Sequence, residues 1–330
     1  MRKKLLAGLL TVAMAALALT GCGSESSKSS GGDSGEWPPK SITFVCPWSA
    51  GGDTDFNIRT LAKYVEKELD TTITIVNTTG GGGSVASNEV KNGKNDGSTF
   101  LAFDSAIALN KASGITDFGY EAFEPVAMYA KSTGEFIVVR ADYPVDTVQD
   151  LIDYSKAHPG EVKFAANTGG TSYFAVTKLK EAGADFNIVN SGSSSERVAS
   201  LLGNHIDVSV NSMGVVEQYL QTGELKVIGN MATEVPEAYS SYPLVKDQGV
   251  DLSYDLVYNL LAPEGTDAAI IEKLSAAIEK VVNENTDYAE EIKTAYGQTP
   301  YVLTGDEAKA AFQAEDDMYM EYADEFQSAE

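Results

Sequence analysis

The sequence predicts an α/β fold divided into two lobes, and three observations lead to this fold class. Apolar runs rich in β-branched and aromatic residues alternate with amphipathic helical stretches, which indicates a mostly parallel sheet with helices on both faces. Roughly 290 residues follow the N-terminal segment, and this length is too great for one ordinary core but suits two. No motif recurs at the period of a solenoid repeat.

The N-terminal segment has the three parts of an export signal. It is basic from Arg2 to Lys4, apolar from Leu5 to Leu19, and then small. The apolar run is too short for a comfortable membrane span, and it ends in Leu19-Thr20-Gly21-Cys22, which is similar to the lipobox of bacterial lipoproteins. We therefore expect residues 1–21 to be removed and Cys22 to carry acyl chains that hold the protein on a lipid bilayer. The alternative is an ordinary signal with an incidental cysteine.

Residues 22–40 are expected to form this anchor and a flexible tether. From Gly23 to Pro39 the chain is mostly serine, glycine and charged residues, so it cannot bury enough apolar surface to fold. About 18 residues of this composition have an r.m.s. reach of roughly 23 Å. With Cys22 modified, Cys46 is the only other cysteine, so we expect no internal disulfide.

The predicted strands are apolar, β-rich runs bounded by turn-forming residues. The first extends from Ser41 to Pro47 and leads through a glycine turn into a helix. The others are Thr72 to Asn77, Thr99 to Asp104, Phe136 to Arg140, Val162 to Asn167, Phe186 to Asn190, Ile206 to Asn211, Leu225 to Asn230 and Leu256 to Leu261.

The predicted helices have apolar stripes at helical spacing and recognisable ends. The first extends from about Thr54 to Leu69 and carries Ile58, Leu61 and Val65 on one stripe. The later helices are one that Thr147 caps and that stops at His158-Pro159-Gly160, one from Ser172 to Gly183, one from Asp267 to Asn283, and a last one from Asp306 to about Gln327.

The sequence lacks the residues that most enzyme and metal-site motifs require. The only histidines are His158, in a Pro-Gly turn, and His205, in a polar turn, and both are expected at the surface. No zinc-protease, paired-cysteine, nucleophile-elbow or phosphate-loop motif occurs. The formal net charge of −24 argues against nucleic acid as a partner. We therefore expect a protein that is not an enzyme, with no catalytic residue, metal or cofactor.

Two partial motifs are weighed against this expectation. Asp53-x-Asp55-x-Asn57 begins like a calcium loop, but Ile58 stands where the turn needs glycine and Tyr64 where a glutamate should bind. Gly81-x-Gly83-x-x-Ala86, followed by Asp104 at the end of the next strand, imitates a dinucleotide-binding fingerprint. Extra residues separate its glycines from the preceding strand, and the following helix is short. A nucleotide-dependent enzyme stays as an alternative.

Four polar, glycine-rich loops each follow a predicted strand and open a helix, at residues 49–55, 79–84, 168–172 and 191–195. Such loops expose backbone N–H groups at the positive end of a helix, beside short hydroxyl side chains. In an open parallel sheet the ligand crevice lies at the carboxyl ends of the strands, where these loops fall. Together they would form an anion cradle without lysine or arginine. For any single loop, the alternative is simple helix capping.

Several spaced motifs resemble a known family. Ile42 to Arg59 reads ITFVCPWSAGGDTDFNIR, Ile73 to Gly83 reads ITIVNTTGGGG, and Asp96-Gly97-Ser98-Thr99 follows. Further along are FAANTGGTS at Phe164 to Ser172, LLGNHIDV at Leu201 to Val208 and LLAPEGT at Leu260 to Thr266. This set resembles the substrate-binding proteins of tripartite tricarboxylate transporters, the Bug family, and the resemblance extends from residue 41 to about residue 325.

The resemblance implies a type II periplasmic-binding-protein clamp, in which two α/β lobes joined by crossover strands hold ligand carboxylates in the cleft between them. Lobe 1 is expected at residues 41–140 and 260–330, and lobe 2 at residues 141–259. Arg59 also matches, and we interpret it as a structural ion-pair partner. The ligand-binding residues carried over by motif are Ser49, Gly52, Thr54, Asp55, Thr79, Gly81, Gly82, Thr168, Gly169, Gly170, Thr171, Ser172, Ser193, Ser194 and Ser195.

The chain also departs from the family. Many members have Pro-Tyr-Lys-Gly-Ser where this chain has Asn190-Ser191-Gly192-Ser193-Ser194, and Trp48 and Tyr173-Phe174 add bulk near the cleft rim. The ligand therefore stays open among di- and tricarboxylates, acidic amino acids and aromatic acids. We expect a monomeric extracytoplasmic solute-binding lipoprotein that delivers its ligand to membrane permease subunits. An anchored ligand sensor for a signalling kinase is the alternative.

Overall fold

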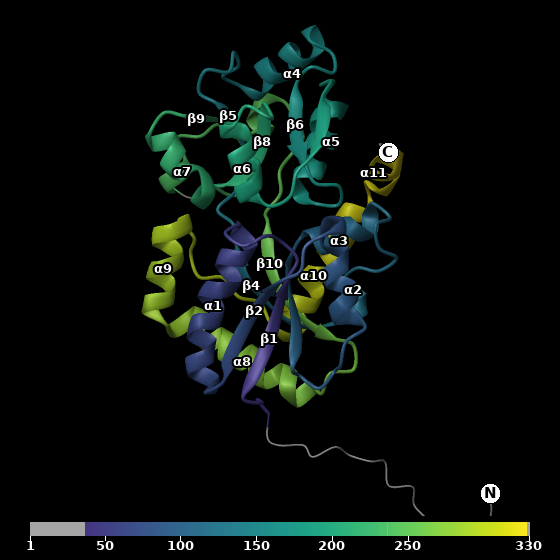
Figure 1. The fold of residues 1–330 in the computed structure, drawn as a ribbon, viewed down its shortest axis with the longest axis vertical. Helices are drawn as coiled ribbons and strands as arrows, with labels where there is room; N and C mark the ends of the chain where they lie inside the picture. Colours follow the sequence, from purple (N-terminus) through teal and green to yellow (C-terminus); the bar gives the residue numbers. More distant parts are fainter. Residues whose placement is uncertain (1–36, 236, 329–330) are drawn as a thin grey trace, which may run out of the picture. The chain divides into compact units, whose positions relative to one another are not determined.

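Two five-stranded sheets, each flanked by helices, organise the computed structural model of the chain (Figure 1). The structure describes residues 37–235 and 237–328. The predicted signal peptide, the Cys22 lipidation site and the tether up to residue 36 lie outside the described residues. Within the described part of the chain, no helix has both the length and the apolar character needed to cross a membrane.

The first sheet has the strand order β2-β1-β3-β10-β4. Its strands β2, β1 and β3 run parallel, whereas β10 runs antiparallel to both β3 and β4. Their bounds are β1 Ser41–Cys46, β2 Thr72–Asn77, β3 Thr99–Asp104, β4 Phe123–Lys131 and β10 Val257–Pro263.

The second sheet repeats this arrangement with the order β7-β6-β8-β5-β9. Strands β7, β6 and β8 run parallel, and β5 runs antiparallel to β8 and β9. The bounds are β5 Glu135–Arg140, β6 Lys163–Ala166, β7 Asn187–Asn190, β8 Val208–Ser212 and β9 Leu225–Asn230.

Each sheet is mostly parallel, as the alternation of elements predicted, with one strand, β10 or β5, that runs against the other four. The reason for this one antiparallel strand lies in how the chain crosses between the sheets. The chain leaves the first sheet at the end of β4 and enters β5 directly. It later returns from the second sheet into β10, and Val257 at the start of β10 pairs with Lys131 at the end of β4. A strand that leaves toward the other lobe and one that arrives from it must run in opposite directions.

The strand pairing corrects the expected lobe boundaries. The chain changes sheets between Lys131 and Glu135 and returns between Asn230 and Val257. The expected division at residues 140 and 259 would place β5 and the first part of β10 in the wrong lobe. Both segments are plain apolar runs in the sequence, and only their hydrogen-bonding partners, far away along the chain, decide the sheet to which they belong.

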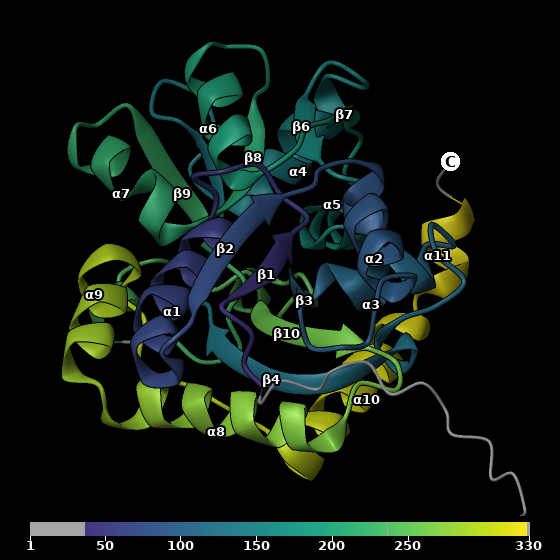
Figure 2. The ribbon, with the colours of Figure 1, turned by 60° about the horizontal axis from the view of Figure 1, so that its bottom comes forward.

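Eleven α-helices cover the sheets in the described residues. Figure 2 shows α1, α8 and α9 on one side of the first sheet and α2, α3 and α10 on the other. The bounds are α1 Asp53–Leu69, α2 Ser84–Lys91, α3 Ala106–Ala112, α4 Val148–Ala157, α5 Thr171–Glu181, α6 Ser194–Leu202, α7 Met213–Gln221, α8 Ala268–Glu284, α9 Thr286–Tyr296, α10 Gly305–Met320 and α11 Ala323–Ser328.

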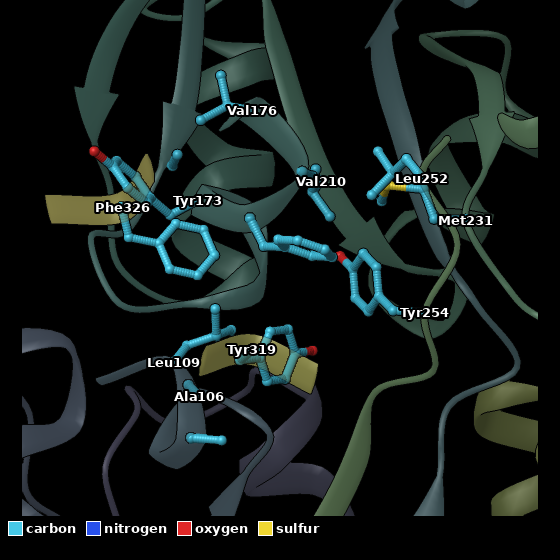
Figure 3. Packing of buried hydrophobic residues seen from close by; sticks show 14 of the residues in the cluster. Ala106, Leu109, Tyr173, Val176, Val210, Met231, Leu252, Tyr254, Tyr319 and Phe326 are labelled. Atoms are coloured by element: carbon cyan, nitrogen blue, oxygen red, sulfur yellow. The ribbon is translucent and has the colours of Figure 1, made fainter. Parts of the chain in front are cut away.

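The apolar core follows the alternation of side chains along the strands. Phe44 belongs to the cluster under α1 and α8, whereas its neighbour Val45 belongs to the cluster on the opposite face of the sheet. This second cluster continues into the other lobe. Figure 3 shows it where α5 meets the C-terminal helices, with Tyr173 beside Phe326 and Leu109 beside Tyr319. The C-terminal helices therefore pack apolar groups of both lobes together.

Two elements differ from the sequence prediction. Strand β4 was not predicted; it contains Pro125 and is an edge strand, where proline is tolerated, that pairs only with β10 among the described strands. The single last helix is divided into α10 and α11 by a turn at Glu321 and Tyr322. The turn brings the rings of Tyr322 and Phe326 against Phe174 of α5. By contrast, β2, β3 and β9 have the predicted bounds.

Candidate functional site

The loops that follow the parallel strands of the two sheets meet between the lobes and enclose two hollows. One is a small cavity of about 30 Å³, which has room for about one water molecule and is called the enclosed cavity below because most of its lining residues are buried. The other is an open cleft of about 500 Å³. Both are lined by Trp48, Asn167, Gly192 and Ser193, so they adjoin one another.

The lobes touch directly around these hollows. The Ser49 hydroxyl donates to Glu196 Oε1 at 2.6 Å, and the Ser194 hydroxyl donates to Asp53 Oδ1 at 2.7 Å. Asn110 of the first lobe donates from Nδ2 to the Gly169 carbonyl at 3.1 Å. The structure therefore shows the lobes in a closed arrangement.

Most residues carried over from the sequence motifs line one or both hollows. The ones that do so are Ser49, Thr54, Thr79, Gly81, Gly82, Thr168, Gly170, Thr171, Ser172, Ser193 and Ser194. Gly52, Asp55, Gly169 and Ser195 do not. Gly52 backs onto Ser193, where an added Cβ would lie 3.3 Å from the serine Cβ, and the Ser195 hydroxyl lies 2.9 Å from that of Ser193. Gly52 and Ser195 therefore contact Ser193, which lines both hollows, and do not line a hollow themselves.

Asp55 is directed away from the hollows into a network of its own. It accepts hydrogen bonds from Arg59 Nε at 2.9 Å, from the Gly51 amide at 3.0 Å and from Asn77 Nδ2 at 2.8 Å. Burial raises the pKa of Asp55, but these hydrogen bonds outweigh it and hold the pKa below its usual value. Arg59 is the structural ion-pair partner that the sequence predicts. The Asp55 carboxylate therefore fixes the turn before α1.

The first three residues of a run of four glycines line the open cleft. Gly80, Gly81, Gly82 and Gly83 all have positive φ, between +55° and +127°, a conformation that only glycine adopts readily. Gly81–Gly83 form a single 3₁₀ turn that leads into α2. Successive amides in left-handed and turn conformations form concavities that bind anions. Opposite these glycines, Thr168 and Ser193 of the second lobe contribute hydroxyl-bearing side chains.

The helices at the site differ in how their first turns are capped. Helix α6 has a complete capping box, in which the Ser193 side chain accepts from the Glu196 amide and Glu196 bonds back to the Ser193 amide. The loop at residues 191–195 therefore caps a helix, which was the alternative to ligand binding for any single loop. Helices α1 and α5 begin after Gly52 and Gly170 without a side-chain cap. Thr54 of α1 and Thr171 of α5 line the enclosed cavity, so the first turns of these helices border the site from opposite lobes.

Three buried carboxylates that the site prediction did not include line the enclosed cavity. They are Asp53 in the first turn of α1, Asp104 at the end of β3 and Glu135 at the start of β5. The partial calcium and dinucleotide motifs contain Asp53 and Asp104, so the sequence marked both for other reasons. Glu135 carried no signal, because it only precedes an apolar strand.

Each carboxylate accepts hydrogen bonds from neutral groups. Asp104 accepts from Trp48 Nε1 at 2.6 Å, the Thr54 hydroxyl at 2.7 Å and the Ala106 amide at 2.9 Å. Burial raises the pKa of Asp104 to about 6, and the charge of Asp53 adds to this rise, while the hydrogen bonds oppose it. The dinucleotide role of Asp104 thus has no support, because its oxygens already bind groups of the first lobe.

Glu135 has the more strongly raised pKa. Its Oε2 accepts from the hydroxyls of Thr171 and Tyr254, each at 2.7 Å. Burial and, to a lesser extent, the charge of Asp53 raise its pKa to about 7, although Arg197 and the two hydroxyl hydrogen bonds oppose the rise. Asp53 accepts from the hydroxyls of Ser194, at 2.7 Å, and Tyr258, at 3.0 Å.

Arg197 also lines the enclosed cavity, so the expected cradle without lysine or arginine is corrected. Arg197 is only 7% exposed, and its guanidinium donates to the carbonyls of Val210 and Gly192 and to the Ser194 hydroxyl. Arg197 carries no signal in the sequence, because it lies one turn inside α6 and not in the loop before it. Among residues 37–328, no group of three or more histidine, cysteine or acidic side chains is arranged to hold a metal ion.

One family model matches most of the chain. The sequence model of the "tripartite tricarboxylate transporter family receptor" matches residues 57–316. The chain is similar to protein BugT of Bordetella pertussis, with 26% identity over 280 residues that cover 83% of this chain and 85% of BugT.

Two similar solved structures contain a named small molecule. Rpa4515 of R. palustris with adipate has a TM-score of 0.79 and 21% identity and covers 88% of this chain and 98% of its own. MatC of Rhodopseudomonas palustris with bound malate also has a TM-score of 0.79 and 21% identity, with 87% and 100% coverage. At this identity the likeness establishes a shared fold.

Proposed function

The chain belongs to the tripartite tricarboxylate transporter family of receptors, and from this we propose that it captures a small carboxylate between its lobes and delivers it to the permease subunits of a membrane transporter. The family consists of extracytoplasmic solute-binding receptors. The observation that carries the carboxylate proposal is the open cleft, whose walls combine the turn of positive-φ glycines with hydroxyl-bearing side chains from both lobes.

Backbone amides and hydroxyls can hold a carboxylate without a basic side chain. Hydrogen bonds to an ionised acceptor are about twice as strong as neutral ones, and helix N-termini and glycine turns supply such donors at no conformational cost to a side chain. The only charged residue that lines the open cleft in the described part of the chain is Glu196, and its Oε1 is already bonded to Ser49. The adipate and malate held by two relatives of this fold support the same ligand class.

Ligand capture would proceed by hinge closure. The two chain crossings, at residues 132–134 and between Asn230 and Val257, contain the segments that a hinge would bend. Gly134 has a φ of +128° and packs its Cα against Asn230, so this crossing contains a residue that tolerates unusual backbone angles. Ligand would bridge the lobes, and the closed form would dock on the permease.

The lipid anchor is a further part of the proposal and rests on the lipobox-like end of the export signal. A receptor held on the bilayer through Cys22 and a roughly 23 Å tether would stay at high local concentration near its permease. Replacing Cys22 with alanine would then move the protein from the membrane fraction to the soluble fraction of lysed cells.

Calorimetric titration of the full-length protein with a panel of organic acids, including adipate and malate, tests the carboxylate proposal. We expect saturable binding of at least one acid, and Gly52→Glu should abolish it, because the new side chain would enter the lobe contact at Ser193. Gln149→Glu adds the same charge at an exposed position of α4 and serves as the control. Absence of heat and of thermal stabilisation across the panel would refute carboxylate binding.

A further inference from the structure

The enclosed cavity holds more negative than positive charge. Asp53, Asp104 and Glu135 line it with 7%, 5% and 1% of their surface exposed, and Arg197 is the one basic residue of its lining in the described residues. Acidic side chains are almost never buried to this extent unless they are paired. This cavity adjoins the cleft for which carboxylate binding is proposed, so the following inference rests on that proposed function.

None of these three carboxylates takes part in an ion pair with any described residue. Their hydrogen bonds come from hydroxyls, an indole and an amide, all of them neutral donors. Neutral donors solvate a buried carboxylate, but they leave its charge in place. The cavity therefore lacks counter-charge.

Arg197 cannot supply all of the missing positive charge. Its guanidinium donates to two backbone carbonyls and to Ser194, and this holds it against β8 and the α6 loop. A guanidinium carries one positive charge, whereas the three acids carry up to three negative ones. Two negative charges stay uncompensated when all three acids are ionised.

The helix N-termini that could attract an anion into this cavity are already matched to the protein's own acids. Asp53 lies in the first turn of α1 and reaches Ser194 at the start of α6. Asp104 accepts from the Ala106 amide at the start of α3, and Glu135 accepts from Thr171 at the start of α5. A ligand carboxylate placed here would be repelled by up to three such acids, whereas one acid, Glu196, lines the open cleft in the described residues.

We propose that the receptor selects a ligand with an ammonium group at one end and a carboxylate at the other. The ammonium group enters the enclosed cavity between Asp53, Asp104 and Glu135. The carboxylate lies in the open cleft against Gly81, Gly82 and the facing hydroxyls. Because the two hollows adjoin at Trp48 and Ser193, one short molecule can occupy both once the lobes have closed around it. The preferred ligand class is thus an amino acid with separated charges, and not a diacid.

The raised pKa values of Asp104 and Glu135 agree with this arrangement, because protons take the place of the missing cation. They also give the preference a pH dependence. Raising the pH from 6 to 8 ionises both acids, which strengthens binding of an ammonium group and weakens binding of a second carboxylate. The groups that act on Glu135 from the surrounding elements are Asp53 of α1, Arg197 of α6, Thr171 of α5, Tyr254, Tyr258 of β10 and Tyr319 of α10.

Paired compounds of similar length test the proposal by calorimetry on the full-length protein at pH 8. In each pair an aminomethyl group replaces one carboxylate: succinate with 4-aminobutanoate, glutarate with 5-aminopentanoate and adipate with 6-aminohexanoate. We expect the best amino acid to bind at least tenfold more tightly than its diacid, and this ratio to fall at pH 6. Equal or tighter binding of the diacids would overturn the proposal and leave the proposed carboxylate receptor intact. Binding of neither set would count against both.

Two variants test which side chains cause the preference for the amino acid over its diacid. Asp53→Asn keeps an oxygen that can accept a hydrogen bond but removes the charge, and we expect it to reduce the preference at least fivefold while the diacids bind as well or better. Glu135→Gln makes the same change at the opposite wall of the cavity. Asp142→Asn, at a side chain that is 85% exposed, is the matched control and should leave the preference unchanged. A preference that survives both cavity variants would refute the assigned ammonium site.

Discussion

Replacing Gly82 with alanine tests whether the lobes meet in the ligand-bound form as they do in this structure. A Cβ at Gly82 would lie 2.6 Å from the carbonyl oxygen of Thr168, in the opposite lobe, whereas ordinary van der Waals contact begins at 3.4 Å. The lobes would have to stay apart by the difference, about 0.8 Å, at this point. A form with separated lobes has no such clash, so the substitution acts on closure.

The size of the effect follows from two separate costs. A φ of +64° at an alanine costs about 1–2 kcal/mol whether the lobes are open or closed, so it lowers stability without changing affinity. Overpacking a close contact costs about 1–3 kcal/mol, and here this cost falls on the closed form alone. A closure cost of about 2 kcal/mol corresponds to roughly 30-fold weaker binding.

Gly160→Ala supplies the matched control, because Gly160 has a similar φ of +70° and no atom within 4 Å of an added Cβ. We expect calorimetry with adipate and 6-aminohexanoate to show roughly 30-fold weaker binding in Gly82→Ala than in Gly160→Ala. Thermal unfolding without ligand should place the two variants close together. Equal affinities in the two variants would mean that Gly82 and Thr168 do not approach each other in the bound state, and the reasoning would fail.

Three further predictions concern stability and capping. The free energy of unfolding should fall by about 3 kcal/mol or less between pH 4.5 and 7 through Glu135, because the folded chain keeps a proton that the unfolded chain has lost. Urea titrations should show this fall reduced in Glu135→Gln. Thr147→Ala and Ser193→Ala each remove a capping box and should each lower the free energy of unfolding by about 1 kcal/mol. Only Ser193→Ala should also weaken ligand binding, because Ser193 lines both hollows. Gly83→Ala should cost about 3 kcal/mol in the same titrations, because its Cβ would lie 2.3 Å from the Phe103 ring.

Each of these three predictions has a result that would contradict it. A stability that rises from pH 5 to pH 7, with the same slope in Glu135→Gln, would show that Glu135 is not protonated in the folded chain. Equal binding by the two capping variants would remove Ser193 from the ligand site. A Gly83→Ala variant as stable as Gly160→Ala would show that Phe103 can move away without cost.

Much of the architecture could be predicted from local patterns. The stripe of Ile58, Leu61 and Val65 predicted α1, and all three residues are fully buried. Thr147 forms the predicted cap of α4, with a complete capping box to Asp150. The glycine run predicted a turn, because only glycine adopts positive φ at several successive residues. The motifs predicted the family, which the family model confirms.

Elements whose role depends on distant partners were mispredicted or missed. Strand β5 was assigned to the first lobe, and β4 was not predicted, because each is defined by hydrogen bonds to strands far away in sequence. Asp55 has the family motif's sequence position, but its side chain is fully engaged with Arg59 and Asn77. A motif places a residue on an element and does not decide which way the side chain is directed.

The sequence by itself determined the alternation of strands and helices, the glycine turns and the family, because side-chain periodicity and backbone preferences act over a few residues. Only the tertiary structure decided which charges meet. Asp53, Asp104 and Glu135 lie on three separate elements of two lobes, yet they line one cavity. Their placement in one cavity results from sheet order and lobe closure, which depend on long-range pairing, and burial there raises the pKa values of Asp104 and Glu135.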